Sequence, residues 1–147
     1  MAQVRMVTVR RVPAPPDDVY RLVADYQRRR DYLTDNFTDY AVEEGGQGAG
    51  TRMRYRLHAG RRVRDCRMSV SEPDPGRVIV EEDANSSLRT RWAVTAQGGR
   101  SSVEVEVTWD GAGGVAGFFE SMFAPLGLRR IYDQVLDRLA RVAARSS

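Results

Sequence analysis

Residues 7–33 read VTVRRVPAPPDDVYRLVADYQRRRDYL and decide how the fold begins. A short alternating strand runs into the proline-rich turn at residues 12–16. A helix follows, because apolar side chains then recur at helical spacing, at Val19, Leu22, Val23 and Tyr26. Residues 27–33 predict a second short helix or a turn. Only strands are expected from there until one long helix closes the chain.

Three further strands follow this start. Residues 37–42 begin the first, and the glycine-rich residues 43–50 turn the chain. Residues 51–58 alternate strictly, which predicts a half-buried strand with arginines on the wet face and Met53, Tyr55 and Leu57 on the dry face. A hairpin turn at residues 59–60 leads into a return strand that places Cys66, Met68 and Val70 inward.

The last hairpin gives the clearest register. Residues 77–82 form a strand after the proline turn at residues 72–76, and strands 88–96 and 100–110 then flank Gly98-Gly99. This register places Trp92 opposite Val105 and Thr90 opposite Val107 on the inner side. It places Arg91 opposite Glu106 outside, as antiparallel pairs favour.

Residues 115–145 are predicted to be helical, with a wide apolar stripe at Leu128, Ile131, Tyr132, Val135, Leu136, Leu139 and Val142. Pro125 interrupts the pattern, so residues 118–124 should form a separate or kinked segment. That kink would place Phe119 and Phe123 near one end of the interior.

These elements predict an α+β fold in which a curved antiparallel sheet of about seven strands wraps around the long C-terminal helix. We expect one domain over residues 1–147. Where such a sheet curls away from the helix, the interior forms a pocket lined by apolar and aromatic side chains. The expected partner is therefore a small hydrophobic ligand.

Composition excludes several other functions. The 23 cationic residues are all arginine, so lysine Schiff-base chemistry is excluded. The use of arginine in place of lysine is explained by the codon usage of a GC-rich genome, and we therefore expect no nucleic-acid partner. A single His58 and a single Cys66 make a metal site implausible, and we expect neither a metal nor a cofactor. The sequence lacks a secretory signal and an apolar run long enough for stable membrane insertion, which predicts a cytoplasmic protein. A monomer or homodimer is expected.

In this order of elements, the chain resembles the polyketide cyclase/dehydrase and lipid-transport superfamily, with its START-like or birch-pollen-allergen-like helix-grip fold. The matching features are the proline turn before Val19-Tyr20, the segment 45–51, the turn at residues 72–77, the glycine-rich final hairpin and the long last helix. The resemblance implies a ligand of polyketide or other aromatic type. It also implies that Arg, Tyr and sometimes His side chains in the pocket hold carbonyls or enolates.

Arg64 and Tyr55 are the candidate catalytic residues. An inward Arg64 could stabilise an enolate, and Tyr55 could orient a carbonyl or act as an acid. The alternatives are that Arg64 lies at the sheet edge in water and that Tyr55 belongs to the core with its hydroxyl satisfied. Arg62 is a weaker version of the same hypothesis.

The candidate ligand-binding residues share an expected inward position. They are Tyr26, Tyr32, Phe37, Met53, Leu57, Arg62, Cys66, Met68, Trp92, Val107, Trp109, Phe119, Phe123 and Tyr132. Each could equally be plain core, because the pocket of a helix-grip fold is the middle of its core. His58 is expected at an exposed turn, with the alternative that a bulge before the turn directs it inward. Residues 28–30, three arginines in a row, are expected to be a solvated helix end, with contact to phosphate or lipid headgroups as the alternative.

Two functions stay open at this point. One is a polyketide cyclase-like enzyme, and the other is a non-catalytic carrier or sensor of a lipid, quinone or other hydrophobic metabolite. A protein-interaction module that uses the arginine-rich outer sheet is disfavoured, because Glu104 and Glu106 offset much of that charge.

Overall fold

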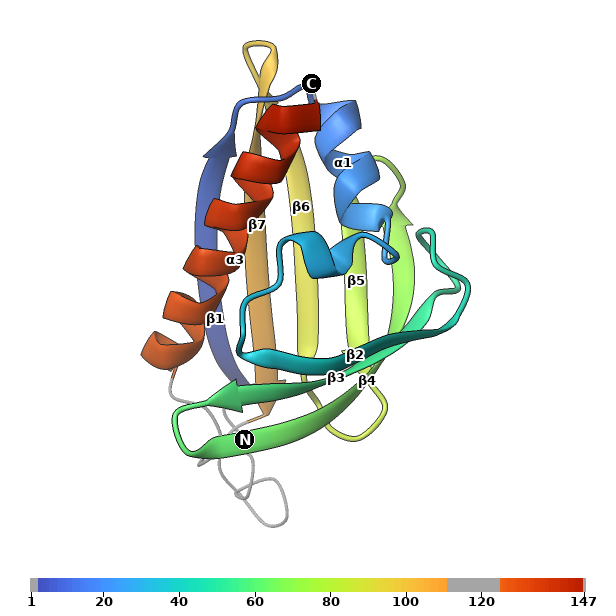
Figure 1. The fold of residues 1–147 in the computed structure, drawn as a ribbon, viewed down its shortest axis with the longest axis vertical. Helices are drawn as coiled ribbons and strands as arrows, with labels where there is room; N and C mark the ends of the chain where they lie inside the picture. Colours follow the sequence, from blue (N-terminus) through green and yellow to red (C-terminus); the bar gives the residue numbers. More distant parts are fainter. Residues whose placement is uncertain (1–2, 111–124, 147) are drawn as a thin grey trace.

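In the computed structural model, which describes residues 3–110 and 125–146, seven strands form one sheet in the order β1-β7-β6-β5-β4-β3-β2 (Figure 1). All neighbouring strands pair antiparallel. The strands are β1 (Gln3–Val12), β2 (Phe37–Glu44), β3 (Arg52–Ala59), β4 (Arg62–Asp74), β5 (Val78–Asp83), β6 (Arg89–Gln97) and β7 (Arg100–Asp110). The helices are α1 (Pro16–Ala24), the short 3-10 helix η1 (Arg29–Asp31) and α3 (Pro125–Ser146). The predicted α+β helix-grip class is confirmed.

Local sequence explains where α1 begins. Pro16 occupies the first turn, where its missing N–H costs nothing, and Asp17 and Asp18 are favourable beside the positive end of the helix dipole. The helix buries Val19, Tyr20, Leu22, Val23 and Ala24 against the sheet. The chain then turns into η1, which is the predicted second short helix.

The final hairpin has the predicted register. Trp92 pairs with Val105, Thr90 with Val107 and Arg91 with Glu106. The turn residues Gly98 and Gly99 have φ of 55° and 84°, which glycine adopts without strain.

One predicted turn is shorter than expected. Residues 72–76 were expected to turn as a unit, yet β4 continues to Asp74, which pairs with Val78. The register shifts between Ser71 and Asp74. Such a bulge accommodates Pro73, which cannot donate to a regular ladder.

The helix α3 spans Pro125–Ser146, so Pro125 is the first described residue of the helix, where a missing N–H is tolerated. The segment 118–124, with Phe119 and Phe123, lies outside the described residues. The α3 helix packs mainly along β1 (Figure 1), where Thr8 donates to Asp133 and Arg10 forms an ion pair with Asp137 at 3.0 Å. Its predicted apolar stripe is buried at Leu128, Ile131, Tyr132, Val135, Leu136 and Leu139.

Candidate functional site

Four aromatic rings from four different elements form a continuous series through the interior. Phe37 of β2 contacts Tyr55 of β3, with ring centroids 5.2 Å apart, and Tyr132 of α3 at 5.9 Å. Tyr132 in turn contacts Trp92 of β6 at 6.2 Å. All three contacts are edge-to-face, the arrangement that aromatic quadrupoles favour. These four residues were predicted from sequence as site residues, and the fold brings them together.

Phe37 also connects this ring series to the surface. It belongs to the lining of a pocket of about 390 Å³, together with Arg30, Leu33, Thr34, Asp35, Asp39 and Tyr40. The pocket lies where η1 and the chain after it pass β2. Phe37 therefore belongs both to the lining of this pocket and to the ring contacts with Tyr55 and Tyr132 in the interior.

A buried ion pair lies beside the rings, and sequence reasoning missed it. Arg29 is 3% exposed and Glu81 is 1% exposed, and Arg29 Nη2 lies 2.9 Å from Glu81 Oε2. The Tyr26 hydroxyl donates to the same carboxylate oxygen at 2.6 Å. Arg29 Nη2 also donates to the carbonyl of Val23 at 3.1 Å, at the end of α1.

Aromatic rings surround the Arg29 guanidinium. Its Cζ lies 4.4 Å from the centroid of the Tyr26 ring, 4.7 Å from Trp92 and 5.6 Å from Tyr32. Contacts of this length place a cation within reach of the negative face of each ring. These three rings and the Glu81 carboxylate together hold the guanidinium in one position.

The expectation that residues 28–30 form a solvated helix end is therefore wrong for Arg29. Arg28 and Arg30 are exposed, and Arg28 pairs with Asp31 at 3.1 Å. A 3-10 turn has three residues per turn, so one side chain in three faces the core. In η1 that side chain is Arg29.

Glu81 carried a signal that the alternation of β5 could have revealed. It lies two residues after the buried Ile79, hence on the same face of the strand. Its direct neighbours across the sheet are Val70 on β4 and Thr90 on β6, both buried. A glutamate on that row required a buried partner, and no local pattern indicates that the partner is Arg29.

Burial and charge shift the pKa values of this cluster. Burial and the Glu81 carboxylate raise the pKa of Tyr26 well above its ordinary value. Burial by itself would lower the pKa of Arg29, but Glu81 outweighs it and the pKa is raised. For Tyr32, burial raises the pKa to about 12 although Arg29 opposes the shift. The tyrosines therefore stay neutral and can donate hydrogen bonds, and Arg29 stays charged.

Tyr55 and Cys66 lie side by side on the inner face of β3 and β4, where they pair directly. Burial, and then Tyr132, raise the pKa of Tyr55 well above its ordinary value. Burial, and then Asp83, raise the pKa of Cys66 to about 12. Neither group is an available base or nucleophile near neutral pH. The Tyr55 hydroxyl can act only as a donor or a weak acid.

The predicted arginines lie toward the end of the β3–β4 hairpin. Arg64 is half-buried, and its Nη2 donates to the carbonyl of Asn85 at 3.3 Å. Together with Arg56, Val63 and Asp65 it lines a surface pocket. Arg62 is exposed. Arg64 thus occupies an intermediate position between the inward and the edge alternatives, and Arg62 occupies the edge.

The remaining predicted lining residues are buried, namely Met53, Leu57, Met68, Val107 and Trp109. His58 is half-buried, and its Nε2 lies 2.8 Å from the hydroxyl of Thr38. The expectation of an exposed turn residue is therefore wrong, because the adjacent strand β2 covers one side of the ring.

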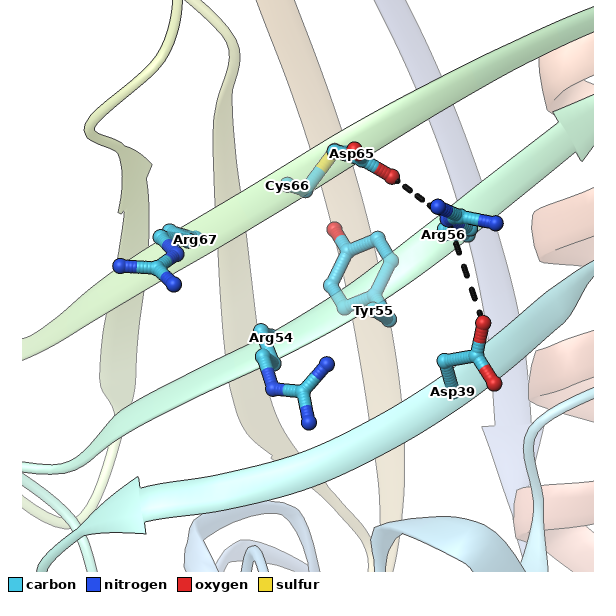
Figure 2. A pocket seen from close by; sticks show the side chains of 7 residues that line it. All are labelled: Asp39, Arg54, Tyr55, Arg56, Asp65, Cys66 and Arg67. Atoms are coloured by element: carbon cyan, nitrogen blue, oxygen red, sulfur yellow. Dashed lines mark hydrogen bonds and ion pairs between the residues drawn. The ribbon is translucent and has the colours of Figure 1, made fainter.

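A third pocket, of about 160 Å³, opens on the outer face of β3 and β4 (Figure 2). Arg54, Arg67 and Arg56 surround it, and Arg56 is ion paired with Asp65 at 2.8 Å and Asp39 at 3.9 Å. Figure 2 shows the Tyr55 hydroxyl directed toward Cys66, between the strands. The arginines of this outer face are therefore paired with carboxylates, and Tyr55 and Cys66 also line the pocket.

Within residues 3–110 and 125–146, no three side chains of His, Cys, Asp or Glu come together in a way that could hold a metal ion. No helix in this part of the chain is long and apolar enough to cross a membrane.

The sequence and fold are similar to those of known proteins. The family model described as polyketide cyclase/dehydrase and lipid transport matches residues 3–144. The solution structure of the KanY protein is 45% identical, with a TM-score of 0.87 over 98% of this chain and 99% of that chain. The protein TTHA0849 from Thermus thermophilus is 19% identical, with a TM-score of 0.78 over 98% of this chain and 99% of that one. Major latex-like protein 151 from Panax ginseng is 10% identical, with a TM-score of 0.73 over 96% and 97%, and so shares the fold. A search of curated protein sequences returned no match.

Proposed function

We propose that this chain, which belongs to the polyketide cyclase/dehydrase and lipid transport family, binds a small hydrophobic metabolite of aromatic or polyketide type between its sheet and α3. The observation that carries the proposal is the ring series from Phe37 through Tyr132 to Trp92. Edge-to-face rings of this kind offer a planar ligand both apolar surface and stacking partners. The surface pocket that Phe37 helps to line is where we propose that the ligand enters.

Cyclisation or dehydration of a bound poly-β-ketone would need a proton donor and a group that stabilises an enolate. Tyr55 is the donor that we propose, because its raised pKa keeps the hydroxyl protonated and its ring is one end of the ring series. Arg64 is half-buried near the start of β4, and we propose that it stabilises the negative charge of the enolate.

A non-catalytic carrier or sensor is the second candidate function. It is favoured by the raised pKa values of Tyr55 and Cys66, which keep both groups protonated near neutral pH, so that neither can take the proton that aldol chemistry must remove. A carrier needs only the apolar walls and the ring series.

Tryptophan fluorescence tests ligand binding directly. The Trp109→Phe variant leaves Trp92 as the only tryptophan, so quenching then reports on the ring series. We expect saturable quenching by polycyclic phenols and quinones. Absence of saturable quenching by phenols, quinones and fatty acids alike would refute the proposed function.

Variants then separate enzyme from carrier. Incubation with a polyketide-forming enzyme system should yield a cyclised product with the wild type and much less with Tyr55→Phe and Arg64→Met. The exposed Arg62→Met variant is the matched control for Arg64→Met. Binding without any change in product distribution would favour the carrier.

A further inference from the structure

The Arg29–Glu81 pair is difficult to explain as a stabilising element. Both side chains are almost completely withdrawn from water. Removing two charges from water costs more than their attraction returns unless the geometry is excellent, and apolar replacements of such pairs are often neutral or stabilising. This cost indicates that the pair has a role other than stabilising the fold.

Two buried donors of this cluster have no hydrogen-bond partner among the described residues. They are Arg29 Nε and Trp92 Nε1. Buried N–H groups in folded proteins are rarely left unpaired, because each costs free energy when no acceptor replaces water. The two residues are in contact, since Arg29 Cζ lies 4.7 Å from the Trp92 ring centroid.

The charge of the cluster limits what can satisfy these donors. Arg29 is already balanced by Glu81, and Tyr26 remains a neutral phenol that donates to the same carboxylate. A second anion would bring an uncompensated negative charge into the interior, within a short distance of Glu81. A neutral acceptor brings no such charge.

We propose that Arg29, supported by Trp92, anchors a neutral carbonyl oxygen of the bound metabolite, so that the ligand class is a planar ketone or quinone rather than a carboxylate or fatty acid. This inference rests on the proposed function, because it assumes a ligand against the ring series. Glu81 and Tyr26 are positioning residues in this arrangement. They hold the guanidinium through Nη2, which pairs with Glu81 and donates to Val23, while Nε–H has no partner among the described residues.

Three probes with one ring skeleton test the proposal: fluorenone with a carbonyl, fluorene without oxygen, and fluorenecarboxylate with an anion. Binding is measured by equilibrium dialysis. We expect the wild type to bind fluorenone at least about tenfold more tightly than fluorene, as a charge-assisted hydrogen bond provides. Fluorenecarboxylate should bind most weakly.

The decisive variant combines Arg29→Met with Glu81→Gln. It removes both charges together, so no buried charge is left unpaired, and Gln still accepts from Tyr26. It should fold, retain fluorene binding and lose the preference for fluorenone. The combination of Arg28→Met with Asp31→Asn is the matched control, because it removes the neighbouring exposed ion pair.

The outcomes separate the two proposals. If the wild type binds none of the three probes, the proposed function fails and the carbonyl anchor fails with it. If fluorene binds but fluorenone has no advantage, or if the double variant keeps that advantage, only the anchor is refuted. Tighter binding of fluorenecarboxylate than of fluorenone would also refute it.

Discussion

Tyr26 donates its hydroxyl to the Glu81 carboxylate across 2.6 Å, although the two residues lie 55 positions apart in the chain. This bond joins the connection between α1 and η1 to the middle of β5. Since the same carboxylate oxygen is ion paired with Arg29, one acceptor holds two elements against the sheet. The charges of this cluster can be tested without any ligand.

Removing one charge of the pair should cost far more than removing both. Arg29→Met leaves Glu81 buried without its cation, and we expect a loss of about 3–5 kcal/mol in the free energy of unfolding. Arg29→Met combined with Glu81→Gln should recover most of that loss. Urea denaturation of the wild type, both single variants and the double variant measures the coupling. Additive losses would show that the pair is not energetically coupled.

Stability should fall in alkaline solution. Tyr26, Tyr55 and Tyr132 have pKa values raised by burial, whereas in the unfolded chain they titrate near about 10. Above that pH the unfolded chain loses protons that the folded chain retains, so the free energy of unfolding decreases as pH rises. Below it, these groups contribute no pH dependence.

Urea denaturation at a series of pH values checks this slope, and Tyr132→Phe supplies the comparison. The variant lacks one of the raised phenols, so its stability should fall less steeply with pH than that of the wild type. Equal slopes would mean that Tyr132 does not contribute.

Cys66 should be unreactive in the folded protein. Its thiol is buried and its pKa is raised to about 12, so the thiolate is scarce at neutral pH. Reaction with an aromatic disulfide reagent should be at least about a hundredfold slower in buffer than in urea. Fast modification under native conditions would contradict the observed burial.

Gly48→Ala should destabilise more than Gly60→Ala. Both glycines have positive φ, 57° and 63°, so both variants carry similar backbone strain of about 1–2 kcal/mol. A Cβ on Gly48 would collide with the carboxylate of Glu72, whereas one on Gly60 meets open space.

The collision at Gly48 matters because Glu72 is held in place. It accepts from the Tyr20 hydroxyl at 2.5 Å and from the backbone N–H of Ala49 at 2.8 Å. Displacing it would weaken both bonds and add about 1–2 kcal/mol to the loss. Thermal unfolding of the two variants should rank Gly60→Ala as the more stable one.

Much of the fold could be read from local patterns. Strict alternation at Met53, Tyr55 and Leu57 identified the inner face of β3, because successive side chains of a strand point to opposite faces. Gly98-Gly99 identified the last hairpin and its register. The four residues of the ring series could be predicted as interior residues, since Phe37, Tyr55, Trp92 and Tyr132 all fall on apolar faces.

Charged residues were placed less well. Arg29 was predicted to be solvated with its neighbours, and Glu81 was not considered as part of the site. Local propensity ranks an arginine in a run of three as a surface residue, and only the direction of η1 turns one of them inward. Arg64, by contrast, lies on the predicted face but close enough to the hairpin end to reach Asn85.

The sequence by itself determined the order of the elements, the inner face of most strands and the aromatic content of the interior. These properties follow from periodicity and turn chemistry, which act over a few residues. Only the tertiary structure decided that Arg29 meets Glu81, and that Tyr26 and Trp92 surround the guanidinium. Such a meeting depends on how the sheet curves beneath α1 and η1. That curvature is set by the packing of the whole interior and is not encoded in any single stretch of the chain.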